Sequence, residues 1–303
     1  MAADLLVRGA VALAHRGRVS PTLVAATIVA LGTSLPELVV SIRASLTGHP
    51  DMVLGNVIGS NTANILLVVG TAAIVAPLVV DSPAQRRDSF SMMGVSLVFL
   101  LMCVTTGLTR QAGALLLLGF VMVWGVAARE SLRERRSRAD EPPLVWVLGL
   151  PKKLPTIAVF IGLGLLGLPV GARLVVGAAV DIAARLGVTE AVVGLSIIAV
   201  STSLPELATT VVAAYQKRPD VAVAGVLGSN IVNLVGIMGF AAVISPTPIE
   251  VPASMRVLDL PVMMGATLLL AVTIGLRKPI GRAAGVVGIT AYAGYIVVLF
   301  LAN

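Results

Sequence analysis

Two glutamates stand in the same short motif at two points of the chain, each inside a long apolar stretch. Residues 28–38 read IVALGTSLPEL and residues 197–207 read IIAVSTSLPEL, so Glu37 and Glu206 each directly follow a proline. A carboxylate at the centre of a membrane helix costs about 2.5 kcal/mol or more, and two such costs at equivalent points require a functional reason. Because proline lacks the N–H that would bond the carbonyl four residues back, it interrupts the helix. The motifs therefore predict two broken helices that offer carboxylate, hydroxyl and main-chain oxygens to a cation.

A second pair of motifs follows each glutamate at a fixed distance. Residues 55–64 read GNVIGSNTAN and residues 225–233 read GVLGSNIVN. Their glycines permit close approach of helices, and the serine and final asparagine of each motif lie four positions apart, hence on one helix face. Gly-Ser-Asn segments alone are typical of helix packing, and only their fixed distance from the glutamates favours a binding role. The predicted ligands from these motifs are Ser60, Asn64, Ser229 and Asn233. We expect Asn61 and Asn230 to point elsewhere, into helix packing.

The charges at this predicted site favour an exchange. All its ligands are oxygens, which select hard cations such as calcium, sodium or protons over zinc or copper. Two ionised glutamates that converge repel each other in a low dielectric, and one divalent cation neutralises both. When that cation leaves, sodium ions or protons must replace it. The alternative is a protonated structural acid at a proline kink, and the duplication argues against it.

The elements that position these residues form an internal repeat. An offset of 169 residues carries Glu37 onto Glu206, Gly59-Ser60-Asn61 onto Gly228-Ser229-Asn230, and Gly70 onto Gly239. One period contains five apolar stretches, an odd number, so the second copy must enter the membrane from the opposite side. Inverted repeats of this kind place a shared site near the bilayer midplane and allow inward-open and outward-open states.

Composition sets the class of protein. The chain has 303 residues, of which 57% are apolar and only 12% charged, whereas a soluble domain carries about 25% charged residues. A helical span needs about 20 mostly apolar residues. We predict an all-α polytopic membrane protein of about ten helices in two inverted five-helix repeats, over residues 3–15, 21–47, 52–76, 90–108, 111–128, 154–184, 190–215, 221–245, 257–276 and 281–301. The first is too short to cross alone, and we expect the true start to lie upstream, since half a span leaves helix-end groups facing lipid.

Several other classes are excluded. The apolar runs are continuous rather than alternating, which argues against membrane strands. One cysteine and two histidines leave no thiolate or imidazole metal cluster and no Cys/His or Ser/His catalytic pair, so we expect neither an enzyme nor a cofactor. The net charge of +7 comes with only 4% aromatic residues and no basic module, so nucleic acid is not the expected partner.

The distribution of Lys and Arg residues instead indicates how the chain is oriented in the membrane. If the N-terminus lies outside, sixteen of the 22 Lys and Arg residues fall on inward connectors, and only Arg110, Arg185 and Arg256 fall on outward ones. The positive-inside rule then predicts that both termini are outside. The corresponding division of the chain is a first half over residues 1–128, a cytoplasmic basic loop over 129–153, and a second, inverted half over 154–303.

These paired motifs resemble the alpha repeats of the calcium:cation antiporter superfamily, specifically its prokaryotic sodium/calcium exchanger-like branch, and the match covers practically the entire chain. The resemblance implies electrogenic exchange of several sodium ions for each calcium ion at a cluster of cation sites. It places calcium between the carboxylates of Glu37 and Glu206 and the main-chain oxygens of Thr33 and Thr202. For sodium it implies Ala30, Ala199, Thr33, Ser34, Thr202, Ser203, Ser60 and Ser229, with Asn64 and Asn233 at the middle position. Some relatives carry an aspartate at the position of Asn233. The absence of that aspartate from this chain argues against potassium co-transport.

We therefore expect a secondary active antiporter that exchanges calcium for sodium by alternating access. It would be a multi-pass monomer in the inner (plasma) membrane, whose partners are the two ions and the lipid bilayer. Calcium/proton exchange remains open, because a glutamate pair can also carry protons. A cation channel does not need mirrored broken helices, and a purely structural membrane protein does not explain the buried acids.

Overall fold

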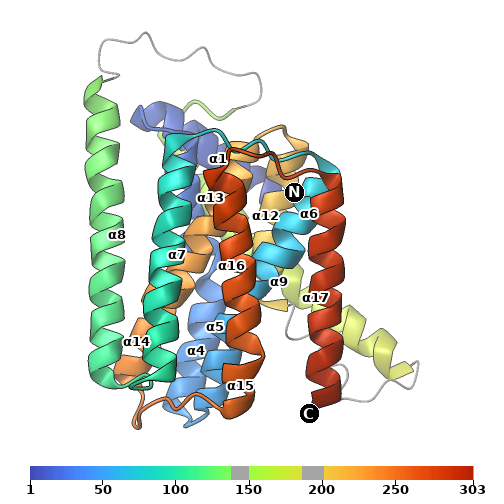
Figure 1. The fold of residues 1–303 in the computed structure, drawn as a ribbon. Helices are drawn as coiled ribbons and strands as arrows, with labels where there is room; N and C mark the ends of the chain where they lie inside the picture. The colour runs from blue at the N-terminus through green and yellow to red at the C-terminus, as the bar shows by residue number, and fades with distance from the viewer. Residues whose placement is uncertain (138–149, 186–200, 303) are drawn as a thin grey trace.

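The structure is a computed structural model that describes residues 1–137, 150–185 and 201–302, and over these residues it is a bundle of helices (Figure 1). The β pairing among them consists of two isolated bridges, Leu78 with Ile280 and Leu108 with Ile249. Each bridge joins the connector after the third span of one half to the connector between the fourth and fifth spans of the other half. The predicted all-α class is confirmed.

The first half begins with α1 (Ala2–Gly17) and continues through two interrupted spans and two long helices. Both interrupted spans contain a π-helical segment, η1 or η2. Over its described residues, the second half follows the same order from α9 onwards. In chain order the further elements are α2 (Pro21–Val24), η1 (Ala25–Val29), α3 (Ala30–Thr33), α4 (Leu35–Leu46), α5 (Pro50–Ala63), η2 (Asn64–Val69), α6 (Gly70–Val75), α7 (Pro83–Val104), α8 (Arg110–Ser137), α9 (Leu154–Arg185), α12 (Leu204–Tyr215), α13 (Pro219–Ile231), η4 (Val232–Ile237), α14 (Met238–Ile244), α15 (Ala253–Val257), α16 (Asp259–Gly275) and α17 (Arg282–Ala302).

Most of the ten predicted spans are long enough to cross a bilayer. Seven helices of the described residues are, and the pair Pro21–Thr33 and Leu35–Leu46, bent by 43°, makes an eighth. The first span, α1, has 16 residues and is short as predicted. The predicted seventh span, residues 190–215, starts outside the described residues, which resume before α12.

Two predicted boundaries are wrong. The fourth span begins at Pro83 instead of near residue 90, because Ser82 and Gln85 form a capping box that starts the helix in polar sequence. The fifth, α8, continues to Ser137 instead of ending near residue 128, because its charged last turns stay helical beyond the apolar stretch. Hydropathy marks the part of a helix that lies in lipid, whereas capping groups decide where the helix ends.

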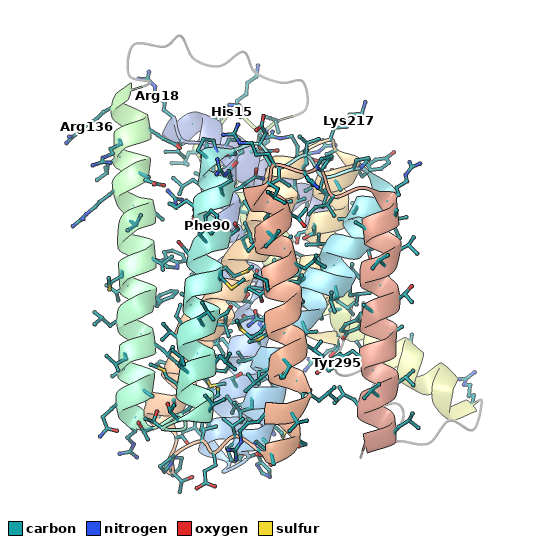
Figure 2. The ribbon with its side chains drawn as sticks, viewed as in Figure 1. His15, Arg18, Phe90, Arg136, Lys217 and Tyr295 are labelled. Atoms are coloured by element: carbon teal, nitrogen blue, oxygen red, sulfur yellow. The ribbon has the colours of Figure 1, made fainter. Side chains whose placement is uncertain are left out.

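Basic residues gather at one end of the bundle. Figure 2 labels His15, Arg18, Arg136 and Lys217 at this end, whereas Tyr295 lies toward the other. The C-terminus lies at the end away from these basic residues (Figure 1). Part of the predicted basic loop, residues 138–149, lies outside the described residues. The compartment that each end faces stays a prediction.

The 169-residue repeat extends to the backbone. The helix breaks at Ser34 (φ −83°, ψ 6°) and at its repeat mate Ser203 (φ −85°, ψ 3°) in nearly the same conformation. The π-helical segment η2 begins at Asn64, and its counterpart η4 contains Asn233. Single π turns inside α-helices are frequent at functional sites. The backbone thus shows equivalent halves, while their inverted orientation stays a prediction.

The two halves interlock through glycines. A Cβ atom added at Gly285 of α17 would lie 2.5 Å from the main-chain oxygen of Gly70 in α6. Likewise, a Cβ added at Gly113 of α8 would lie 2.8 Å from the oxygen of Gly239 in α14. Gly70 and Gly239 are repeat mates, so the third span of each half contacts the fifth span of the other half backbone to backbone. Small residues at such crossings are what permits this approach in membranes.

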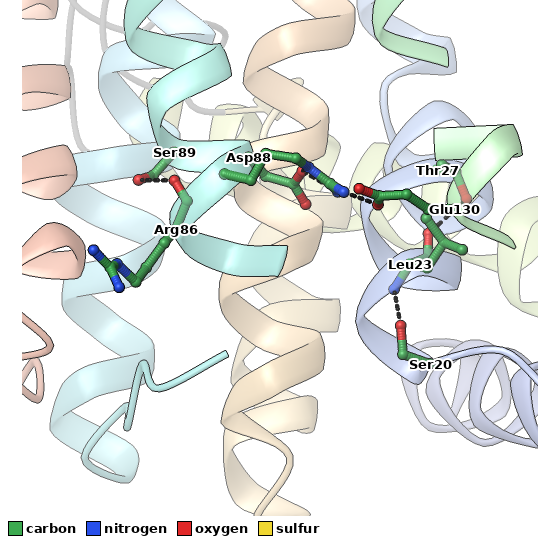
Figure 3. A network of polar contacts seen from close by, with 8 residues as sticks. Ser20, Leu23, Thr27, Arg86, Asp88, Ser89 and Glu130 are labelled. Carbon is green, nitrogen blue, oxygen red and sulfur yellow. Dashed lines mark hydrogen bonds and ion pairs between the residues drawn. The ribbon is translucent and has the colours of Figure 1, made fainter. Parts of the chain in front are cut away.

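The fourth span of each half carries an aspartate, partly buried in the first half and buried in the second, and the same Met-Met-Gly sequence begins four positions later. Residues 88–94 read DSFSMMG and residues 259–265 read DLPVMMG. Asp88 accepts a hydrogen bond from Arg87 at 2.6 Å, and Arg87 also pairs with Glu130 of α8 (Figure 3). Asp259 accepts a hydrogen bond from Tyr295 of α17. Each aspartate therefore helps to tie the fourth span of its half to the fifth.

Candidate cation-binding site

The helix breaks place both glutamates at the start of a new helix. The helix α3 ends at Thr33, α4 starts at Leu35, and Glu37 lies in its first turn after a proline. The helix α12 repeats this arrangement, with Glu206 in its first turn. Proline suits the first turn because the N–H that it lacks has no partner there. The unpaired N–H groups at such helix starts favour anionic groups, here the two carboxylates.

The carboxylate of Glu37 is fully buried without a hydrogen-bond partner. Its exposed fraction is 0%, and neither carboxylate oxygen has a partner. A bare carboxylate in a low dielectric is strongly unfavourable unless it is paired, coordinates a metal or becomes neutral. The fold therefore leaves Glu37 in need of a cation or a proton.

Glu206 lies close to Glu37 and to the helix break of the first half. It is 2% exposed, and its Oε1 accepts a hydrogen bond from Oγ of Ser34 at 3.3 Å. Its Oε2 has no partner. The hydroxyls of Thr33 and Ser229 also face this carboxylate, and the negative charge of Glu206 acts directly on Glu37. Two acids from opposite halves thus meet among hydroxyl groups.

Hydroxyl pairs join the broken helices to the Gly-Ser-Asn helices of the opposite halves. The Thr33 and Ser229 hydroxyl oxygens lie 3.4 Å apart, and those of Ser60 and Thr202 lie 3.3 Å apart. The two pairs are repeat mates of each other. Four of the predicted ligands therefore meet in two symmetric contacts, of which the Thr33–Ser229 pair faces Glu206.

The asparagines of the predicted middle position are also buried. Asn64 donates from Nδ2 to Oδ1 of Asn230 at 3.0 Å, which leaves Oδ1 of Asn64 without a partner. Both polar atoms of the Asn233 side chain lack partners. Asn230, which we expected to point into helix packing, contacts the predicted ligand Asn64 as well as Sδ of Met92 in α7. The motif gave no signal for this contact, because the side chain of its repeat mate Asn61 makes no hydrogen bond.

Of the remaining predicted ligands, Ala30 already accepts several hydrogen bonds. Its main-chain oxygen receives the N–H of Ser34 at 3.1 Å and the hydroxyls of Thr33 at 3.3 Å and Ser229 at 3.5 Å. Oγ of Ser203 is buried and has no partner. Ala199 lies outside the described residues.

The donor set fits a hard cation. In the described part of the chain no three His, Cys, Asp or Glu side chains gather as a metal cluster. The two carboxylates are instead supplemented by hydroxyl, amide and main-chain oxygens, which are ligands that calcium and sodium accept. A separate cavity of about 220 Å³ lies between α2, η1, α7, α8 and α13, and none of the predicted ligands lines it.

Close packing fixes one wall of the site. A Cβ atom at Gly228 would lie 2.3 Å from the main-chain oxygen of Ala26 and 2.7 Å from Cβ of Ala30. Only glycine permits α13 to approach the first broken helix so closely. This approach brings Ser229, the next residue, against Thr33.

Comparison with known proteins gives the same architecture. The family model described as "Sodium/calcium exchanger protein" matches residues 1–127 and 156–301. The putative antiporter CaxA of Alkalimonas amylolytica is 36% identical, with 98% of this chain and 94% of that protein covered. The inner membrane protein YrbG of Escherichia coli (strain K12) is 35% identical, with 94% and 88% covered.

Two exchangers extend the comparison to transport. The sodium/calcium exchanger MaX1 of Methanosarcina acetivorans is 30% identical, with 98% of this chain and 94% of that protein covered. The solved structure of the sodium-calcium exchanger NCX_Mj, soaked with sodium and calcium, superposes with a TM-score of 0.80 and 27% identity, with 98% of this chain and 92% of that chain covered. This chain therefore belongs to the sodium/calcium exchanger family of membrane antiporters.

Proposed function

We propose that this protein exchanges calcium for sodium across the membrane by alternating access. The observation that carries the proposal is the pair of partnerless oxygens on the fully buried Glu37, which lies within reach of the negative charge of Glu206. One calcium ion between the two acids satisfies both charges at once, and its departure leaves a doubly charged site that must take up other cations. The calcium ligands in this proposal are the two carboxylates and the main-chain oxygens of Thr33 and Thr202.

Sodium is favoured over protons as the driving ion by the middle position. Asn64 and Asn233 are amides, which offer neutral oxygen ligands but do not titrate, so they cannot carry protons. A proton-driven cycle would depend on Glu37 and Glu206 alone. The hydroxyls around them, from Thr33, Ser34, Thr202, Ser203, Ser60 and Ser229, supply further neutral oxygens for sodium ions, as do the Ala30 and Ala199 carbonyls.

The remaining features of the proposal concern the setting. The protein acts as a monomer in the inner (plasma) membrane with both termini outside, without a cofactor, and its partners are the two ions and lipid. Inverted halves that share the site near the midplane would provide the inward-open and outward-open states.

Radiolabelled calcium uptake into proteoliposomes tests the proposal when sodium and proton gradients are imposed separately. We expect uptake to require sodium inside the vesicles, to saturate with external calcium, and to generate a membrane potential. Uptake that follows a pH gradient and ignores sodium would establish proton coupling instead. Uptake that needs no counter-ion would indicate a channel.

A further inference from the structure

We propose that Asn230 is a positioning residue for the middle cation position, where it holds the amide oxygen of Asn64 toward the bound ion. This inference rests on the proposed exchange function. It assigns a role in ion binding to a side chain that is not itself a ligand. The contacts that carry it connect α13 with α5, η2 and α7.

A main-chain carbonyl fixes the orientation of the Asn230 side chain. Nδ2 of Asn230 lies 3.4 Å from the main-chain oxygen of Asn61 and 3.7 Å from Sδ of Met92. A carbonyl oxygen has only lone pairs, so the group facing it must be the donor, which is the NH₂ group. The carbonyl oxygen Oδ1 of Asn230 must therefore face the opposite way.

This orientation determines that of Asn64. Oδ1 of Asn230 lies 3.0 Å from Nδ2 of Asn64 and can only accept. Asn64 must then present its NH₂ group to Asn230, and its own Oδ1 remains buried and partnerless. An amide turned the other way would oppose two oxygens at this contact and aim a donor at the cation. The relay from Asn61 through Asn230 thus selects the one orientation of Asn64 that can bind a positive ion.

The other half shows that the motif alone does not produce this arrangement. The repeat mates of Asn230 and Asn64 are Asn61 and Asn233, and in this structure the side chains of both lack hydrogen-bond partners although both are buried. Asn61 contributes to the relay only through its main-chain oxygen. The contact between Asn230 and Asn64 is therefore specific to one half in this structure.

The experiment measures sodium and calcium KM values in reconstituted proteoliposomes for wild type, Asn230→Ala, Asn64→Ala and the double variant. The net contribution of one hydrogen bond favours one orientation of the Asn64 amide over the other about fivefold. We therefore expect Asn230→Ala to raise the KM for sodium about 3- to 10-fold. The KM for calcium and the maximal rate should stay within about twofold, because the carboxylates are untouched. In the Asn64→Ala background, Asn230→Ala should have no further effect, since it acts through Asn64.

The control is Ser96→Ala, which removes a buried hydroxyl that bonds only its own helix, at the main-chain oxygen of Met92. It should leave both KM values unchanged. If Asn230→Ala does not fold, Asn230→Ser replaces it with the same expectation. An unchanged KM for sodium, equal shifts of both KM values, or additive effects in the double variant would overturn the positioning role. Loss of sodium-dependent uptake in wild type would instead refute the proposed function itself.

Discussion

Replacing Glu37 with glutamine separates binding from stability, because the two should change in opposite directions. Two unit charges 4 Å apart interact with about 4 kcal/mol at an effective dielectric constant of 20, and a divalent ion doubles this to about 8 kcal/mol. If the amide oxygen of glutamine recovers half of that energy, about 4 kcal/mol is lost. Calcium affinity should then fall about 1,000-fold, since each 1.4 kcal/mol is tenfold. Calcium-dependent exchange should disappear.

The ion-free protein should not lose stability. Both oxygens of Glu37 are buried without partners, so the substitution removes a charge that the empty fold does not compensate. In the absence of calcium, the midpoint of thermal unfolding in detergent should be equal to or higher than that of wild type. Saturating calcium stabilises wild type by about 2.7 kcal/mol at a concentration of 100 Kd, and this stabilisation should vanish in Glu37→Gln.

The assays are radiolabelled calcium uptake and thermal unfolding with and without calcium. The matched control is Asp81→Asn, because the Asp81 side chain is 73% exposed and lies outside the site. It should retain both uptake and calcium-dependent stabilisation. Wild-type uptake in Glu37→Gln, or an undiminished response of its unfolding midpoint to calcium, would refute the assignment of Glu37 as a calcium ligand.

Two further predictions concern packing. Gly228→Val should abolish folded yield in gel filtration, because its side chain would overlap the main-chain oxygen of Ala26, whereas Gly225→Ala, which has open space around it, should fold normally. Tyr295→Phe should lower the free energy of unfolding by about 1 to 3 kcal/mol, since Asp259 loses the hydroxyl that bonds it in a buried position. An unfolding midpoint equal to that of wild type would contradict the second prediction.

The sequence predicted the broken helices well because their causes are local. A proline two residues into each helix start is sufficient to interrupt the hydrogen-bond ladder, and both breaks lie where the motif indicated, at Ser34 and Ser203. The 169-residue duplication then paired each candidate ligand of the first half with its equivalent in the second half. The roles of the individual ligands in ion binding stay predictions.

Contacts between distant segments were harder to predict. The hydrogen bond from Asn64 to Asn230 depends on the relative rotation of two helices, which the periodicity of one helix does not fix. The contacts of Asp88 and Asp259 depend in the same way on other helices, because Arg87, which bonds Asp88, pairs with Glu130 of α8, and Asp259 bonds Tyr295 of α17. Both aspartates stand before an identical Met-Met-Gly sequence, a signal that the repeat contained at a slightly different offset.

The glycine crossings have a consequence for biosynthesis. The partner of α8 is α14, whose residues leave the ribosome about 100 residues later, and the partner of α6 is α17, which is made later still. During synthesis, the faces of α6 and α8 that carry Gly70 and Gly113 must therefore contact lipid or a chaperone until their partner helices are inserted. A ribosome that stops between the halves would release a chain with no means to complete its own packing.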